Sequence, residues 1–208
     1  MPSGTHLGLF LAAALVLAVS PGPGLLYVLA RSLRGGRRAG LASSGGTALG
    51  GLGHVVAAAF GLSAILAASA LAFGVVKYVG AAYLIVLGLR TLFSQEDAHP
   101  AAPLAGDARR AFRQGVVTEA LNPKTALFFL AFLPQFVDPA APAVPQFLLL
   151  GAISVALNSG ADVVVALLAG PIGGRLWASA RRRRGQRLVA GGVLIGLGAY
   201  VAVAGGEH

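Results

Sequence analysis

Residues 115–137 read GVVTEALNPKTALFFLAFLPQFV, an apolar run of membrane-spanning length interrupted by Asn122-Pro123-Lys124. The proline has no backbone N–H and collides with the preceding turn, so a helix has to break or kink there. The lysine places an ammonium group at membrane depth, which costs roughly 2.5–3.5 kcal/mol on insertion scales. Residues 7–33 form another apolar run, interrupted in the same way by Ser20-Pro21-Gly22-Pro23-Gly24. Two broken membrane helices in corresponding positions are typical of transporters.

The composition is that of an integral membrane protein. Of the 208 residues, 56% are hydrophobic and only 11% are charged, whereas a soluble domain has about 25% charged residues. The chain has no cysteine, which excludes disulfides, thiolate metal sites and cysteine nucleophiles. The net charge of +9 does not indicate nucleic-acid binding, because the basic run 181–184 lies between apolar segments without interleaved aromatic residues.

Six apolar stretches approach the roughly 20 residues that a helix needs to cross a bilayer. They are residues 7–30, 42–67, 69–92, 114–137, 145–170 and 188–204. The sequence therefore predicts an all-α integral membrane protein with six transmembrane helices, of which helices 1 and 4 are broken.

The arginines orient these segments. All fourteen lie in or beside the connections after segments one, three and five, within residues 31–38, 90–113 and 175–187. Since basic residues mark cytoplasmic loops, we expect these connections inside the cell and both termini outside. The two lysines, Lys77 and Lys124, lie within segments. Lys77 is near an outer end, where it can reach the interface by snorkelling.

The chain divides into two blocks of three segments. Because three is an odd number, the second block enters the membrane from the opposite side, as in the inverted repeats of secondary transporters. We therefore predict a first three-helix repeat at 1–93, a cytoplasmic linker at 94–112 and a second three-helix repeat at 113–208. The alternative to a repeat is that the two proline kinks match by coincidence.

The two breaks form the predicted binding site. The half-helix after each proline directs free N–H groups and a positive dipole end into a cavity, which favours an anion such as a carboxylate. The lysine would strengthen this preference. The predicted substrate-binding residues are Ser20, Pro21, Gly22, Pro23, Gly24, Asn122, Pro123, Lys124 and Thr125.

Three ionisable residues near mid-depth, His54, Glu119 and Asp162, are the candidates for proton coupling. Each has an alternative role. Glu119 would form an ion pair with Lys124, Asp162 would pair with Lys124 or bind a substrate ammonium, and His54 would be a neutral packing residue. One histidine and two distant carboxylates do not make a metal site. No cofactor is indicated, and no nucleophile–base set indicates an enzyme.

Three motifs make the chain similar to the LysE/RhtB family of bacterial lysine and homoserine/threonine exporters. They are Ser20-Pro21-Gly22-Pro23, residues 77–84, and Asn122-Pro123-Lys124 with residues 128–137. The resemblance covers essentially the whole chain and implies a carrier in the bacterial plasma membrane that expels amino acids against proton entry. His54 matches a histidine of many members. Where some members have an acidic residue a few positions earlier, this chain has only Gly50, Gly51 and Gly53.

We therefore predict a secondary transporter that exports amino acids or close derivatives by proton antiport. The substrate carboxylate would lie at the half-helix N-termini and its ammonium at Asp162 or Glu119. A cation or metal-ion exporter or channel and a non-transporting membrane scaffold are the alternatives. The expected partners are an amino acid and the lipid bilayer, with no nucleic acid. The glycine pairs Gly46/Gly50 and Gly192/Gly196 would serve either internal packing or a homodimer seam.

Overall fold

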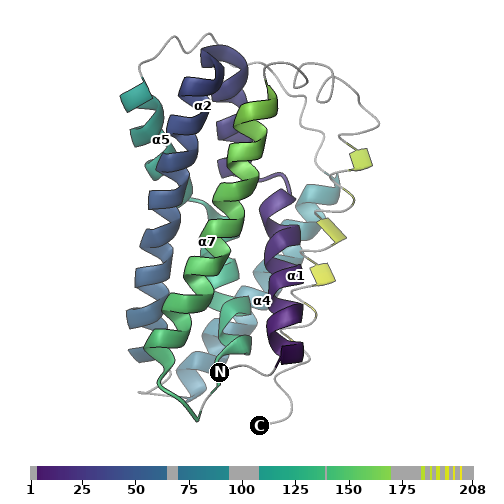
Figure 1. Cartoon of the computed structure of the whole chain (residues 1–208). Helices are drawn as coiled ribbons and strands as arrows, with labels where there is room; N and C mark the ends of the chain where they lie inside the picture. Colours follow the sequence, from purple (N-terminus) through teal and green to yellow (C-terminus); the bar gives the residue numbers. More distant parts are fainter. Residues whose placement is uncertain are drawn as a thin grey trace.

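The structure is a computed structural model of the chain and contains only helices in the residues that it describes (Figure 1). These are residues 4–64, 70–93, 108–138 and 140–169, together with residues 184, 185, 188, 191, 192, 195, 196, 199 and 202. The all-α prediction is confirmed for this part of the chain.

The helices follow the predicted segments closely. In chain order they are α1 (Gly4–Val19), α2 (Pro23–Ala57) with its π-helical extension η1 (Ala58–Leu62), α4 (Ala70–Phe93), α5 (Ala108–Ala120), α6 (Pro123–Leu127), η2 (Phe128–Phe132), η3 (Leu133–Phe136) and α7 (Ala143–Leu168). By length and composition, two helical stretches are candidates for crossing a membrane: Pro23–Leu62, which includes the turn at Gly36 described below, and Ala143–Leu168. A third candidate is the pair Ala108–Ala120 and Pro123–Phe136, which is bent by 42° at its break.

Both predicted breaks are present. The first lies between α1 and α2, where Ser20, Pro21 and Gly22 are not helical, and α1 ends near mid-height of the bundle (Figure 1). The second lies between α5 and α6, at Leu121 and Asn122. Each following helix begins with a proline, which suits the first helical position because the N–H there has no intrahelical partner.

The long helix α2 is a hairpin of two helices that meet at Gly36. This residue has φ 71° and ψ −174°, a backbone conformation open mainly to glycine. A methyl group on Gly40 would clash with the Ser32 hydroxyl, whereas residues eight apart in a straight helix are separated by about 12 Å. The chain therefore folds back at Gly36. The first predicted segment ended at residue 30, but its helix continues to this tight turn.

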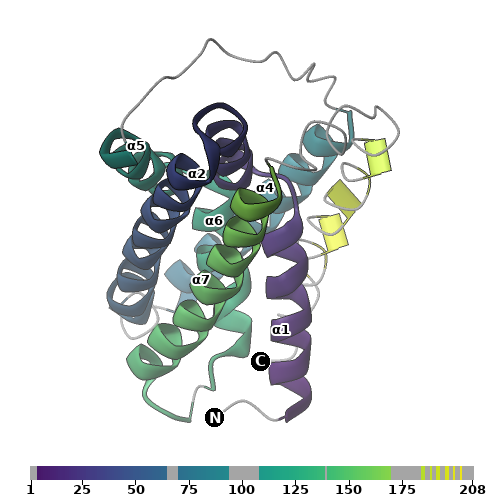
Figure 2. The ribbon, with the colours of Figure 1, turned by 45° about the horizontal axis from the view of Figure 1, so that its top comes forward.

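Helices α2, α5 and α7 lie side by side (Figures 1 and 2), and glycines allow α2 and α5 to approach closely. A Cβ atom on Gly46 would lie 2.1 Å from the Phe112 carbonyl oxygen, and one on Gly50 would lie 2.7 Å from the Val116 carbonyl oxygen. Gly115 has the same role on α5, because a Cβ atom placed on it would lie 2.6 Å from the Ser43 carbonyl oxygen. Gly46 and Gly50 thus serve internal packing.

A cluster of phenylalanine rings packs beside the second break. The rings of Phe132 and Phe136 are 4.8 Å apart, and Phe10 of α1 contacts Phe136 at 5.4 Å and Phe128 at 6.3 Å. All four phenylalanines are buried. By contrast, leucines and valines are exposed on the outer faces of α1, α2, α5 and α7. An apolar exterior of this kind suits a helix bundle surrounded by lipid.

Several predicted features fall outside the described residues. They include most of the sixth segment (188–204), residues 94–107 of the linker and the side chain of Lys77. The linker prediction extended to residue 112, but α5 already begins at Ala108.

Candidate functional site

Lys124 joins the two breaks. Its ammonium nitrogen donates hydrogen bonds to the carbonyl oxygens of Leu17 and Ser20, each at 2.9 Å. These carbonyls lie at the C-terminal end of α1, where the last turn of a helix lacks its regular hydrogen-bond partners. The Leu17 carbonyl also accepts from the Ser20 backbone N–H at 3.2 Å. The lysine side chain is buried, with 6% of its surface exposed. A residue at the start of α6 therefore caps the end of α1.

Glu119 lies on the opposite side of the second break and makes two short contacts. One carboxylate oxygen accepts from the Thr125 hydroxyl at 2.6 Å, and the other accepts from the side-chain amide nitrogen Nδ2 of Asn122 at 3.0 Å. A Cβ atom on Gly24 would lie 2.3 Å from the second oxygen, so the carboxylate rests against the first turn of α2. The positive dipole end there favours an anion, and the protein supplies that anion itself.

Two further side chains cap helix ends at the second break. The side-chain oxygen Oδ1 of Asn122 accepts from the Lys124 backbone N–H at 3.1 Å, so that Asn122 is the N-cap of α6. His54 Nε2 donates to the Glu119 carbonyl oxygen at 2.9 Å, near the end of α5. The imidazole also stacks on Phe129, with ring centroids 6.1 Å apart. His54 is therefore both a capping and a packing residue.

Asp162 on α7 is the third ionisable candidate and has the least complete set of contacts. Its Oδ2 accepts from the Thr47 hydroxyl at 2.7 Å. Its Oδ1 is buried and has no hydrogen-bond partner within the described residues. Because a buried polar atom without a partner costs free energy, this oxygen requires a water molecule, a ligand or a proton beside it.

A small cavity lies beside Glu119 and Thr125. Its volume is about 20 Å³, close to what one water molecule needs. Helices α1, α2 and α7 and both sides of the second break line it, through Ala14, Leu17, Ala18, Thr47, Ala48, Gly51, Glu119, Thr125, Phe128, Phe129, Ser154, Val155, Asn158 and Ser159. An amino acid is far larger than a water molecule, so these walls must separate to admit one.

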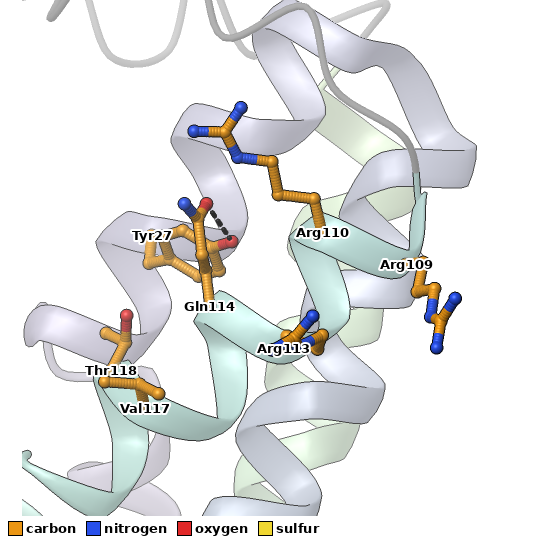
Figure 3. A pocket seen from close by; sticks show the side chains of 7 residues that line it. All are labelled: Tyr27, Arg109, Arg110, Arg113, Gln114, Val117 and Thr118. Atoms are coloured by element: carbon orange, nitrogen blue, oxygen red, sulfur yellow. Dashed lines mark hydrogen bonds between the residues drawn. The ribbon is translucent and has the colours of Figure 1, made fainter.

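A larger groove of about 880 Å³ opens beside the N-terminal part of α5 (Figure 3). Its lining residues are Tyr27, Arg109, Arg110, Arg113, Gln114, Val117 and Thr118. The Tyr27 hydroxyl donates to the Ala111 carbonyl oxygen at 2.8 Å and accepts from Arg31 Nε at 3.1 Å. Figure 3 shows Arg110 on the side of Tyr27 and Gln114, and Arg109 directed away. No residue of the two breaks lines this groove.

The structure thus gathers most of the predicted site residues into one network. Ser20, Asn122, Lys124 and Thr125 are joined with Glu119 and His54 by hydrogen bonds, and Gly22 and Gly24 pack against Lys124 and Glu119. Pro21 lies within the first break, and Pro23 and Pro123 begin the half-helices. The expected Glu119–Lys124 ion pair is absent from this described network, because each charged group has other partners.

Sequence reasoning missed the hydroxyl groups that complete the site, namely those of Thr47, Ser154 and Ser159. A signal was present on α7, where Ser154, Asn158 and Asp162 recur every four residues in an otherwise apolar helix. Within the described residues, no group of three or more His, Cys, Asp or Glu side chains could hold a metal ion.

Comparison with known proteins identifies the family. The model of the LysE type translocators matches residues 15–205. The homoserine/homoserine lactone efflux protein of Salmonella typhimurium is 34% identical over 152 residues, which cover 72% of this chain and 73% of that protein. An uncharacterised membrane protein of Pseudomonas aeruginosa is 35% identical over 198 residues, 88% of each chain.

A further membrane protein, from Vibrio cholerae, is 33% identical over 156 residues, which are 72% of this chain and 74% of that protein. No solved structure matches the chain significantly. The family match covers most of the chain, its relatives are membrane proteins, and its helices include apolar ones of spanning length. The chain is therefore a membrane protein and belongs to the LysE-type translocator family.

Proposed function

We propose that this protein is a secondary transporter that exports amino acids or close derivatives from the bacterial cytoplasm in exchange for protons. The observation that carries the proposal is the hydrogen-bonded network between the two helix breaks. Glu119 of this network lines the small cavity, and Lys124 and Asp162 are hydrogen-bonded to Leu17 and Thr47, which also line it. Charged groups at membrane depth are retained where they bind a substrate or a proton. The relative named for homoserine and homoserine lactone efflux supports a substrate of this kind.

The proposed topology has six transmembrane helices in two inverted repeats, residues 1–93 and 113–208, joined by a cytoplasmic linker at 94–112. The protein lies in the inner membrane with both termini outside. Reciprocal capping supports this arrangement: Lys124 of the second repeat caps α1, and His54 of the first repeat caps α5. If the protein forms a homodimer, Gly192 and Gly196 are the remaining candidates for its seam, because Gly46 and Gly50 contact α5.

The substrate binds between the breaks in this proposal. Its carboxylate approaches Lys124 at the first turn of α6, beside Asn122, Pro123 and Thr125. Its ammonium approaches Asp162 Oδ1 or the carboxylate of Glu119. The first break, Ser20-Pro21-Gly22-Pro23-Gly24, forms the facing wall. Since Lys124 and Glu119 have internal partners in the closed cavity, the zwitterion has to replace those contacts as the walls separate.

Asp162 is the strongest of the three proton-coupling candidates. Both carboxylate oxygens of Glu119 accept hydrogen bonds, and His54 Nε2 is engaged as a helix cap. Asp162 Oδ1 has no partner among the described residues and is free to bind either a proton or an ammonium group. Alternate binding of the two at one carboxylate would make export and proton entry mutually dependent.

The proposal is tested by amino-acid release from bacteria fed a panel of dipeptides. Cells expressing the wild type, Lys124→Ala or an empty vector are compared, with membrane levels of both proteins measured. We expect faster release of one or a few amino acids by the wild type alone. Equal release in all three cultures would contradict the proposed export. Equal release by wild type and variant, above the vector, would contradict the role of Lys124 alone.

A further inference from the structure

Helix α7 carries a polar stripe that the proposed proton and zwitterion sites do not use. Ser154 and Asn158 lie one helical turn apart on the face that continues to Asp162, and Ser159 is adjacent. The rest of this membrane-spanning helix is almost entirely apolar. An amide and two hydroxyls at this depth are unfavourable unless a polar partner meets them.

The described residues provide no such partner. The side chains of Ser154, Asn158 and Ser159 all line the central cavity. None of the hydrogen bonds among the described residues involves these three side chains, although Ser154 has only 7% of its surface exposed. Thr47, on the opposite wall, is different because its hydroxyl already donates to Asp162. The unused hydrogen-bonding capacity is therefore concentrated on α7.

The other residues of the site are either charged or apolar. Lys124, Glu119 and Asp162 are the charged groups suited to the carboxylate and ammonium that all amino acids share. Ala14, Leu17 and Ala18 of α1 form an apolar wall, and Phe128 and Phe129 form another. Among the described residues that line the cavity, the α7 stripe alone offers neutral side-chain donors and acceptors for which the described structure holds no partner. A neutral amide with two hydroxyls matches an uncharged polar group better than a charged or an aliphatic one.

We infer that Ser154, Asn158 and Ser159 form the subsite that binds the substrate side chain and selects one with an uncharged hydrogen-bonding group. This inference rests on the proposed export function and adds to it the residues that set specificity. A site that hydrogen-bonds a substrate hydroxyl discriminates strongly against the isosteric methyl compound, since its own polar groups would then stay unpaired. The subsite therefore distinguishes amino acids of equal size and different polarity.

The test uses purified protein in proteoliposomes and two isosteric substrate pairs, threonine with valine and homoserine with norvaline. Exchange of each labelled compound is measured for the wild type, Asn158→Leu and Ser159→Ala. Ser63→Ala is the matched control, because the Ser63 hydroxyl is also buried without a partner in the described structure but lies outside the cavity. Ligand-induced thermal stabilisation of the same proteins in detergent provides a readout independent of transport.

We expect the wild type and Ser63→Ala to prefer the hydroxyl compound of at least one pair by tenfold or more. Asn158→Leu should reduce this preference at least tenfold, while exchange of the aliphatic compound is kept or increased. Lack of preference in the wild type, or an equal loss for both compounds in Asn158→Leu, would overturn the subsite and leave export intact. Failure of the wild type to exchange any amino acid would instead remove the proposed function on which the subsite rests.

Discussion

Replacement of Lys124 by methionine separates the structural role of this residue from its role in transport. The change removes two hydrogen bonds to the carbonyls that end α1. Hydrogen bonds to charged groups contribute about 1.5–3 kcal/mol each, so roughly 3–6 kcal/mol of stabilisation is lost. Methionine also removes a charge whose insertion at membrane depth costs roughly 2.5–3.5 kcal/mol. The two effects largely offset each other, which leaves a net destabilisation of roughly 0–3 kcal/mol.

A protein of this size loses about 2–4 °C in unfolding midpoint per kcal/mol. Lys124→Met should therefore still fold, with a midpoint lowered by at most about 10 °C in detergent. Export should nevertheless fall to the vector level, because the group that would bind the substrate carboxylate is gone. Arg37→Met is the matched control, since Arg37 is exposed at the α2 hairpin and also carries one positive charge. It should leave both unfolding and export unchanged.

Two results would refute this reasoning. Wild-type export by a folded Lys124→Met protein would show that the ammonium only caps α1. A protein that fails to fold at all would show that the helix cap contributes far more than the offset of the two effects allows. In that second case, export has to be measured with Lys124→Arg, which keeps a cation near the same carbonyls.

Three further changes follow from the contacts of other residues. Gly46→Ala places a methyl group against the Phe112 carbonyl and should destabilise the protein by about 1–3 kcal/mol. Gly53→Ala, in the same helix but with nothing within 4 Å, should leave the unfolding midpoint unchanged or raise it slightly, because alanine favours the helix over glycine. Asp162→Asn keeps the shape of the side chain but cannot exchange a proton and binds an ammonium group more weakly. Amino-acid exchange in proteoliposomes should therefore persist with a raised KM, while transport driven by a pH gradient is lost. Gradient-driven transport at the wild-type rate would exclude Asp162 as the proton carrier. His54→Gln can still donate to the Glu119 carbonyl and should retain stability and proton coupling, while His54→Leu should lower stability by about 1–2 kcal/mol. Loss of coupling in a stable His54→Gln protein would move the proton site to His54.

The breaks were predictable from sequence because proline acts locally. Pro23 and Pro123 lack the N–H that a continuous helix requires, and the structure begins a helix at each of them. The partners of the charged residues were not predictable. Glu119 and Lys124 are five positions apart, which suggested an ion pair, yet Lys124 contacts α1 and the Glu119 carboxylate rests against α2. Those contacts depend on how distant segments meet, and sequence spacing carries no such information.

Reciprocal capping explains why a transporter can retain two broken helices within a bilayer. Each break exposes carbonyls that cost several kcal/mol if left unpaired in hydrocarbon. Lys124 donates hydrogen bonds to the Leu17 and Ser20 carbonyls at the end of α1. His54 adds one to the Glu119 carbonyl of α5, which also accepts from the Asn122 backbone N–H. Because each cap comes from the other half of the chain, separation of the halves would break both caps unless substrate or water replaced them. Under the proposed function, we therefore expect these caps to hold the closed form without substrate, and a zwitterion to favour opening by supplying the contacts that are lost.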